Sequence, residues 1–148
     1  MNVREAMTSD PACCLATDSA QHVAGMLRKL NVGAIPVVTD HESRRLVGII
    51  TDRDLCCSVV ANGLDPQRTS IQNTMSANPV SCREGENLDD CERLMQERQV
   101  RRMPIVDGAG RVIGIVSLAD LALRDKPDNV AKTVAEVSKP QSSAPVGA

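Results

Sequence analysis

The chain has 148 residues, a formal net charge of −2 and no Phe, Tyr or Trp. This length fits one domain, or two small lobes that share a core. The slight negative charge gives no support to a polyanion-binding protein, and without aromatic rings the chain lacks the stacking surface of single-strand nucleic-acid readers. No apolar run approaches the length of a membrane span, and residues 1–10 lack the apolar centre of a signal peptide. We therefore expect a cytoplasmic protein that binds neither nucleic acid nor membrane.

An internal repeat organises the chain. "MTSDPACC" begins at Met7 and "MSANPVSC" begins at Met75, a shift of 68 residues. "VGAIPVV" and "VRRMPIV" keep that shift, and "GIITDRDL" and "GIVSLADL" follow at a shift of 66. We predict one repeat over residues 1–64 and a second over residues 65–125. Residues 126–148 end in a stretch rich in Pro, Ser, Gly and Ala, which predicts a mobile tail, preceded by one or two weak helical turns at Val130, Val134 and Val137.

Each repeat predicts the element order β-α-β-β-α. A short extended piece comes first, and Ser19 or Asn87 then caps a helix. Two apolar, β-branched strands follow, "AIPVVT" with "RLVGIIT" and "MPIVD" with "RVIGIVS". A second helix begins at Thr51 or Ser117. The first helix of each repeat carries an apolar stripe at helical spacing, formed by Ala20, Val23, Ala24, Leu27 and Leu30, and by Leu88, Cys91, Leu94 and Met95.

Each second helix begins with a hydroxyl residue that is followed three positions later by Asp. One interpretation is a capping box, in which hydroxyl and carboxylate satisfy the open amides of the first turn and the acid suits the helix dipole. The other is a ligand site, because a helix start can bind an anion and a carboxylate held there can accept both hydroxyls of a ribose. The spacing fits both uses.

Pro36 and Pro104 interrupt equivalent strands of the two repeats. A proline removes a ladder donor, so it needs an edge or a gap in the pairing. A gap beside a strand–helix junction would leave a cleft that suits a ligand. A plain edge-strand proline explains the residue equally well.

Six cysteines are present: Cys13, Cys14, Cys56, Cys57, Cys82 and Cys91. Adjacent pairs are not CxxC ligand pairs, and only His22 and His41 are available to help complete a zinc site. We expect small buried hydrophobic residues. Metal or redox use, through Cys13, Cys14 or Cys82, is the alternative, and Cys14 and Cys82 stand at equivalent positions of the two repeats.

The order of these motifs resembles that of a pair of CBS domains, also called a Bateman module. The words "GAIPVV…LVGIITDRDL" and "RRMPIV…VIGIVSLADL", with the repeat starts "MTSDP" and "MSANP", carry the resemblance over about residues 1–125. The chain is especially similar to small stand-alone bacterial CBS-domain proteins. The resemblance implies an α+β fold in which two β-α-β-β-α repeats pack by their sheets about a pseudo-twofold axis and leave two clefts. These clefts commonly bind AMP, ADP or ATP, and in some members S-adenosylmethionine or NAD.

The resemblance also implies the site residues. Asp54 and Asp120 would bind ribose, while Thr51 and Ser117 would contact ribose or phosphate. Each cleft would be shared between repeats. The cleft of Thr51, Arg53 and Asp54 would be completed by Val100, Arg101, Arg102, Met103 and Pro104. The cleft of Ser117 and Asp120 would take Val32, Gly33, Ala34, Ile35 and Pro36. The base would be formed by Ala12, Cys13, Val80 and Ser81.

The two predicted clefts differ in charge. Arg101 and Arg102 stand opposite the first cleft, where the second has Gly33 and Ala34, and guanidinium groups suit phosphate. We therefore expect the cleft of Thr51 to be the better phosphate site. The alternative for "RQVRR" is a solvated charged patch.

These features predict a regulatory module that senses AMP, ADP or ATP, forms a homodimer through its helices and acts on a protein target in trans. We expect no metal. The alternative is a cysteine-based redox or metal-responsive CBS protein without bound nucleotide. We expect no enzyme, because the sequence offers no nucleophile–base pair, no Gly-rich phosphate loop and no metal-ligand set.

Overall fold

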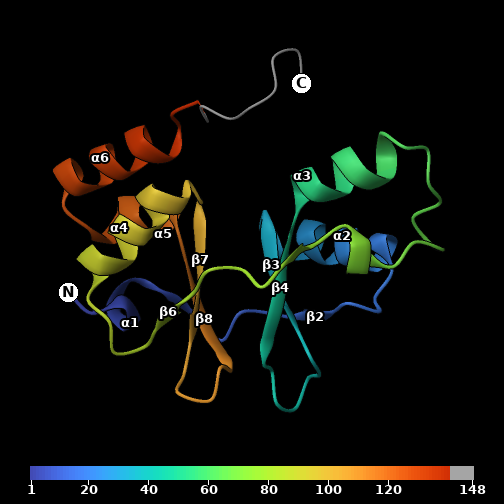
Figure 1. Ribbon diagram of the computed structural model, residues 1–148, viewed down its shortest axis with the longest axis horizontal. Helices are drawn as coiled ribbons and strands as arrows, with labels where there is room; N and C mark the ends of the chain where they lie inside the picture. The colour runs from blue at the N-terminus through green and yellow to red at the C-terminus, as the bar shows by residue number, and fades with distance from the viewer. Residues whose placement is uncertain (141–148) are drawn as a thin grey trace.

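A computed structural model describes residues 1–140, which form two lobes, each built on a four-stranded sheet (Figure 1). The strands of both lobes lie toward the middle of Figure 1 and the long helices lie outward. The first lobe contains, in sheet order, β2 (Cys14–Leu15), β3 (Ala34–Val38), β4 (Leu46–Thr51) and β5 (Ser76–Ala77), with helices α2 (Ala20–Leu30) and α3 (Asp52–Leu55). The second lobe contains β1 (Thr8–Ser9), β8 (Val112–Ser117), β7 (Arg102–Val106) and β6 (Cys82–Arg83), with helices α1 (Val3–Ala6), α4 (Leu88–Arg98), α5 (Leu118–Arg124) and α6 (Pro127–Val137). This is the predicted α+β arrangement of two similar repeats.

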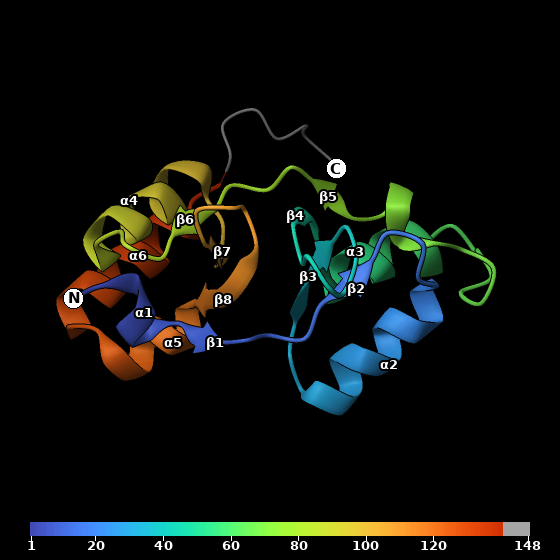
Figure 2. The same ribbon diagram turned by 90° about the horizontal axis from the view of Figure 1, so that it is seen from below.

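The first strand of each repeat pairs in the lobe of the other repeat. β1 runs antiparallel to β8, and β5 runs antiparallel to β4. The chain therefore crosses from β1 in the second lobe to β2 in the first, as Figure 2 shows. Gly114 and Gly48 make room for the two repeat-start methionines, since a Cβ on either glycine would collide with the sulfur of Met7 or Met75.

Two apolar cores fill the lobes, and a third cluster joins them. In the first lobe Ile35, Val37 and Ile50 face helix α2, while in the second the side chains of Met103, Ile105 and Val116 face α1, α4 and α5. The third cluster joins residues from both lobes: Cys13, Val38 and Val112, with Leu15 and Leu46 packed against them. Burial of this cluster holds the two sheets together.

The two prolines lie where the central strands lack a neighbour on one side. β2 pairs only with Val37 and Val38 of β3, and β6 pairs only with Ile105 and Val106 of β7. Pro36 and Pro104 precede these paired residues, so they lie in the part of the strand that has an edge. The same gap leaves the first residues of β3 and β7 open to the space between the lobes.

The predicted helix starts are confirmed. Ser19 accepts a hydrogen bond from the N–H of His22 over 3.1 Å, and Asn87 accepts one from Asp89 over 2.9 Å. Thr51 and Ser117 both form capping boxes with the Asp three residues later. α3 continues into a π-helical turn, η1 (Cys56–Val60), and a 3-10 turn, η2 (Ile71–Asn73), precedes β5.

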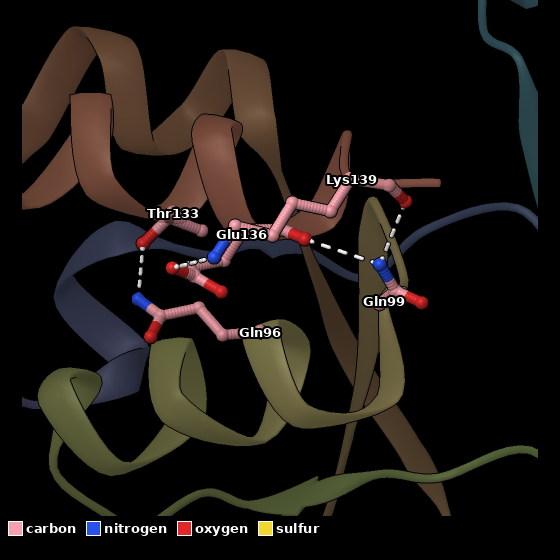
Figure 3. Close-up of polar contacts among 5 residues, drawn as sticks. All are labelled: Gln96, Gln99, Thr133, Glu136 and Lys139. Carbon is pink, nitrogen blue, oxygen red and sulfur yellow. Dashed lines mark hydrogen bonds and ion pairs between the residues drawn. The ribbon is translucent and has the colours of Figure 1, made fainter. Parts of the chain in front are cut away.

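Helix α6 corrects the prediction of a mobile tail. It is an 11-residue helix that packs on α4 and α5. Gln96 donates to Thr133 over 3.0 Å, and Gln99 donates to the carbonyls of Glu136 and Lys139 over 3.3 and 2.9 Å (Figure 3). Thr133 in turn donates to the buried carboxyl of Glu92 over 3.0 Å. Polar partners on α4 therefore stabilise a segment whose composition suggests little order. The part of the predicted tail from residue 141 to 148 lies outside the described residues.

Two stripe residues of α2 are not in the core. Ala20, Val23 and Leu27 are buried as predicted, but Ala24 is exposed and Leu30 is 45% exposed. None of the helices between residues 1 and 140 combines the length and the apolar character that crossing a bilayer requires.

Candidate functional site

A cavity of about 690 Å³ lies between the lobes, at the junction of β8 and α5. Four segments form its wall: the chain around β1, the end of α2 with the start of β3, the start of β7, and the β8–α5 junction. The lining residues are Thr8, Ser9, Asp10, Pro11, Ala12, Leu30, Asn31, Val32, Gly33, Ala34, Ile35, Arg101, Arg102, Ile115, Ser117, Leu118, Ala119 and Asp120. The volume falls within the range of about 300–1,000 Å³ that is usual for small-molecule sites.

A smaller cavity of about 280 Å³ occupies the equivalent place in the other repeat. It is lined by Ile49, Ser76, Pro79, Val80, Arg98, Val100, Arg102 and Pro104. Shifted by 68 or 66 residues, most of these positions are those of the larger cavity. Arg98 and Arg102 replace Leu30 and Ala34 of the larger cavity, which gives the smaller one longer, charged side chains.

Asp120 is a held carboxylate in the larger cavity. Its Oδ2 accepts hydrogen bonds from the N–H and the hydroxyl of Ser117 over 2.9 and 3.0 Å, and its Oδ1 accepts one from the Thr8 hydroxyl over 3.1 Å. A carboxylate has about four acceptor positions, so Asp120 retains capacity for a ligand hydroxyl. The capping box therefore orients the side chain, and the two sequence interpretations of Ser117 and Asp120 are compatible.

Asp54 differs from Asp120 in its hydrogen bonds and in its position relative to the cavity. Its Oδ2 accepts the N–H of Thr51 over 2.9 Å, and its own N–H donates to the Thr51 hydroxyl over 3.1 Å. Neither residue is among those that line the smaller cavity. Within residues 1–140, Ser76, the repeat equivalent of Thr8, makes no side-chain hydrogen bond to Asp54. The first capping box is thus formed without the link to a cavity wall that the second one has.

The two arginines lie on the larger cavity, which corrects the geometry expected for them. Arg101 lines only the larger cavity, and Arg102 lines both. The guanidinium of Arg102 lies against Gly33, at the place that a Cβ on this glycine would occupy. The reason is that the starts of β3 and β7 line the same cavity, so a long side chain at the start of β7 reaches the opposite repeat. Of residues 1–140, no carboxylate forms an ion pair with Arg101 or Arg102.

The structure brings together only part of the predicted set. Ala12, Val32, Gly33, Ala34, Ile35, Arg101, Arg102, Ser117 and Asp120 line the larger cavity, while Val80, Val100, Arg102 and Pro104 line the smaller. Seven predicted residues line neither: Cys13, Pro36, Thr51, Arg53, Asp54, Ser81 and Met103. Met103 is fully buried in the core of the second lobe, and Cys13 is buried between the lobes.

Sequence reasoning missed several lining residues. Thr8 to Pro11 lie on the larger cavity because β1 pairs in the opposite lobe, which the repeat pattern does not reveal. Leu30 and Asn31 lie there because α2 ends at the cavity wall. The conserved order of "MTSDP" and "MSANP" between the two repeats is the one signal in the sequence that marks Thr8 and Ser76 as functional candidates.

The cysteines divide into four buried and two exposed thiols. Cys13, Cys14, Cys82 and Cys91 are buried, as expected, whereas Cys56 and Cys57 are exposed on η1. Burial raises the pKa of Cys14 to about 12, and it also raises the pKa of Cys13. The neighbouring Cys91 thiol, together with burial, raises the pKa of Cys82. These thiols stay protonated near neutral pH, which disfavours them as nucleophiles or metal ligands.

The histidines lie apart from these thiols. His22 is exposed on α2, and His41 is exposed in the turn between β3 and β4. Within residues 1–140, no three His, Cys, Asp or Glu side chains gather in an arrangement that could hold a metal ion.

Comparison with known proteins identifies the family. The CBS-domain family model matches residues 3–60 and 70–125. The chain is 39% identical over 122 residues to the CBS domain-containing protein YhcV of Bacillus subtilis (strain 168), covering 82% of this chain and 84% of that protein.

Two crystal structures resemble the fold at 28% identity. One is Hypoxic Response Protein I with two coordinated zinc ions, with a TM-score of 0.75, covering 85% of this chain and all of that one. The other is the CBS domain pair of protein MJ0100 in complex with 5′-methylthioadenosine and S-adenosyl-L-methionine, with a TM-score of 0.74, covering 83% of this chain and 94% of that one. Two matched repeats, exchanged first strands and paired cavities between the lobes agree with these similarities, and the chain belongs to the CBS-domain family as a pair of CBS domains.

Proposed function

We propose that this chain is a regulatory module that binds an adenine nucleotide in its larger cavity. The observation that carries the proposal is the arrangement of charge there. A held carboxylate, Asp120, and two guanidinium groups without ion-pair partners among residues 1–140 line one cavity whose remaining wall is largely apolar. A nucleotide has the matching parts: a ribose diol, phosphate oxygens and a flat base.

Each part of the ligand has a candidate partner. Asp120 accepts the ribose hydroxyls, and Ser117 supplies a hydroxyl at the helix start. Arg101 and Arg102 donate to phosphate. The base lies among aliphatic side chains such as Pro11, Ala12 and Ile35, which line the same cavity. The complex of the MJ0100 CBS pair with two adenosine-containing compounds supports this ligand class.

The proposal assigns the tighter site to Asp120, in place of the cleft of Thr51 and Asp54 expected from the sequence. Calorimetric titration with AMP, ATP, adenosine and S-adenosylmethionine tests it. Asp120→Asn should lower the affinity for every ribose-bearing ligand about 10-fold or more, because the variant loses charged hydrogen bonds to the ribose. Asp54→Asn is the matched control and should leave the tight site intact. If Asp54→Asn abolishes tight binding while Asp120→Asn does not, the site assignment is wrong.

We also propose that the module works as a homodimer that signals to a protein target in trans. Apolar side chains on the outward helices support association: Leu123 on α5 is 83% exposed, and Val60 on η1 is 72% exposed. Binding between the lobes would change their packing and so the helical surface that a partner contacts.

A further inference from the structure

Among residues 1–140, Arg102 is the one residue that lines both cavities. It opens β7, where it pairs in register with Ser117, and its repeat equivalent is Ala34 at the start of β3. Ala34 lines the larger cavity, so the two cavities differ at this position by a whole arginine side chain. The cavity that receives the methyl group measures about 690 Å³, and the one that receives the arginine stem measures about 280 Å³.

The head of the same side chain points the other way. Its guanidinium lies against Gly33, a residue that lines only the larger cavity. No carboxylate among residues 1–140 forms an ion pair with it, but the Asp52 carboxylate lies close by, with its Oδ2 3.6 Å from the position that a Cβ on Gly33 would take. The side chain thus lines the smaller cavity and carries its charge to the wall of the larger one, in the way that long cationic side chains commonly separate stem from head.

We propose that Arg102 limits the chain to one nucleotide: its side chain narrows the smaller cavity, and its guanidinium binds the phosphate of the ligand in the larger one. This inference rests on the proposed function and adds stoichiometry and selectivity to it. Arg102, together with Arg98 in place of Leu30, makes two sites of common origin unequal. A phosphorylated ligand in the larger cavity fixes the guanidinium there and thereby keeps the smaller cavity closed.

Three variants separate the stem from the charge. Arg102→Ala removes both, and its side chain then matches Ala34. Arg102→Met keeps an unbranched stem and removes the charge. Arg101→Ala removes a guanidinium that lines only the larger cavity. Calorimetric titration of the full chain with adenosine and with AMP gives stoichiometry and affinity for each variant, and melting curves establish that each is folded.

The parent chain should bind one adenosine, and Arg102→Ala should bind two. Arg102→Met and Arg101→Ala should still bind one. All three variants should bind AMP about 10-fold or more weakly than the parent at the larger cavity, while adenosine affinity there stays within a few-fold, because adenosine has no phosphate.

Two adenosines bound to the parent or to Arg102→Met, or one bound to folded Arg102→Ala, would overturn the role of the stem and leave the proposed function standing. Unchanged AMP affinity in Arg102→Met would overturn the role of the guanidinium, and this variant decides that point even if Arg102→Ala does not fold. If neither the parent nor any variant binds adenosine or AMP, the proposed function fails, and the inference fails with it.

Discussion

The Thr8 hydroxyl donates to Asp120 Oδ1 over 3.1 Å, although 112 residues separate the two in the sequence. The contact exists because β1 pairs with β8 in the opposite lobe, so the start of the first repeat meets the last capping box. It fixes the second carboxylate oxygen of Asp120, whose other oxygen is held by Ser117. The exchanged strand thereby orients the carboxylate that we assign to the ribose.

Thr8→Val tests this contact, since valine keeps the shape and removes the donor. We expect a loss of about 1 kcal/mol in the free energy of unfolding and an adenosine affinity that is several-fold lower. The repeat equivalent Ser76 supplies a matched control, because it has no such bond to Asp54. Ser76→Ala should change neither quantity in melting curves and calorimetry. Equal effects of the two substitutions would argue against a special role for Thr8.

Gly33→Ala should lower the preference for phosphorylated ligands. The added methyl group would occupy the place of the Arg102 guanidinium, and the end of a flexible side chain can move aside without unfolding the protein. We expect the ratio of AMP to adenosine affinity to fall about 10-fold, in line with the loss of a charged hydrogen bond. Gly108→Ala is the control, because a Cβ there meets nothing within 4 Å. An unchanged ratio in Gly33→Ala would contradict the placement of the guanidinium.

Glu92 gives the protein a pH-dependent stability. It is 3% exposed, and burial together with a hydrogen bond to Asp125 raises its pKa from 4.5 to about 7. Burial would raise the pKa of Asp125 as well, but hydrogen bonds from protonated Glu92 and from the Lys126 N–H lower it. Below about pH 7 the proton of this pair is therefore expected on Glu92, with Asp125 ionised. Asp89 adds a further negative charge nearby.

The sign of the effect follows from the direction of the shift. A raised folded-state pKa contributes stability that is fully present below pH 4.5 and is lost as the pH rises through about 7. Asp125 also contributes stability, but with the opposite pH dependence: this contribution is lost as the pH falls through its lowered folded-state pKa.

Glu92→Gln should remove the decrease in the free energy of unfolding that the parent shows as the pH rises. Gln retains a donor toward Asp125 and cannot ionise, so the free energy of unfolding should change little between pH 5 and 8. The parent should lose on the order of 2–3 kcal/mol over that interval. Denaturant titrations at several pH values measure the free energy of unfolding of the parent and of Glu92→Gln. Glu97→Gln, on the exposed side of α4, should keep the parental slope. A parental slope in Glu92→Gln would show that another group is responsible.

In thiol labelling with an aromatic disulfide, two of the six cysteines should react rapidly. Cys56 and Cys57 are exposed, while the other four are buried, and burial holds the pKa of Cys14 at about 12, which lowers the population of the reactive thiolate. The double variant Cys56→Ser, Cys57→Ser should react only at the rate of unfolding. Fast labelling of Cys14 in that variant would favour the redox alternative.

Sedimentation should show a species of twice the chain mass of 15.8 kDa at micromolar concentration. Leu123→Glu, which places a charge on an exposed apolar position of α5, should shift the equilibrium toward monomer without lowering the melting temperature of the lobes. A purely monomeric parent chain under these conditions would reject the dimer.

The sequence by itself determined the local structure and the family. Hydroxyl and acid at fixed spacing specify the capping boxes, because the donors they satisfy lie within one helical turn. Pro36 and Pro104 mark the unpaired halves of the central strands for the same local reason. The repeat order, read as a CBS pair, implied the two-lobed fold and clefts shared between repeats.

Only the tertiary structure decided which residues meet across the molecule. The exchange of β1 and β5 depends on pairing between distant strands, so Thr8 on the cavity wall was not foreseeable from local pattern. The direction of Arg102 depends on the approach of the starts of β3 and β7, which spacing along one chain does not encode. Helix α6 is ordered by Glu92 and Gln96 of α4 and by the α4 C-cap residue Gln99, where the sequence alone predicted only one or two weak helical turns. A short helix in water gains most of its stability from such packing, and packing is a property of the folded chain.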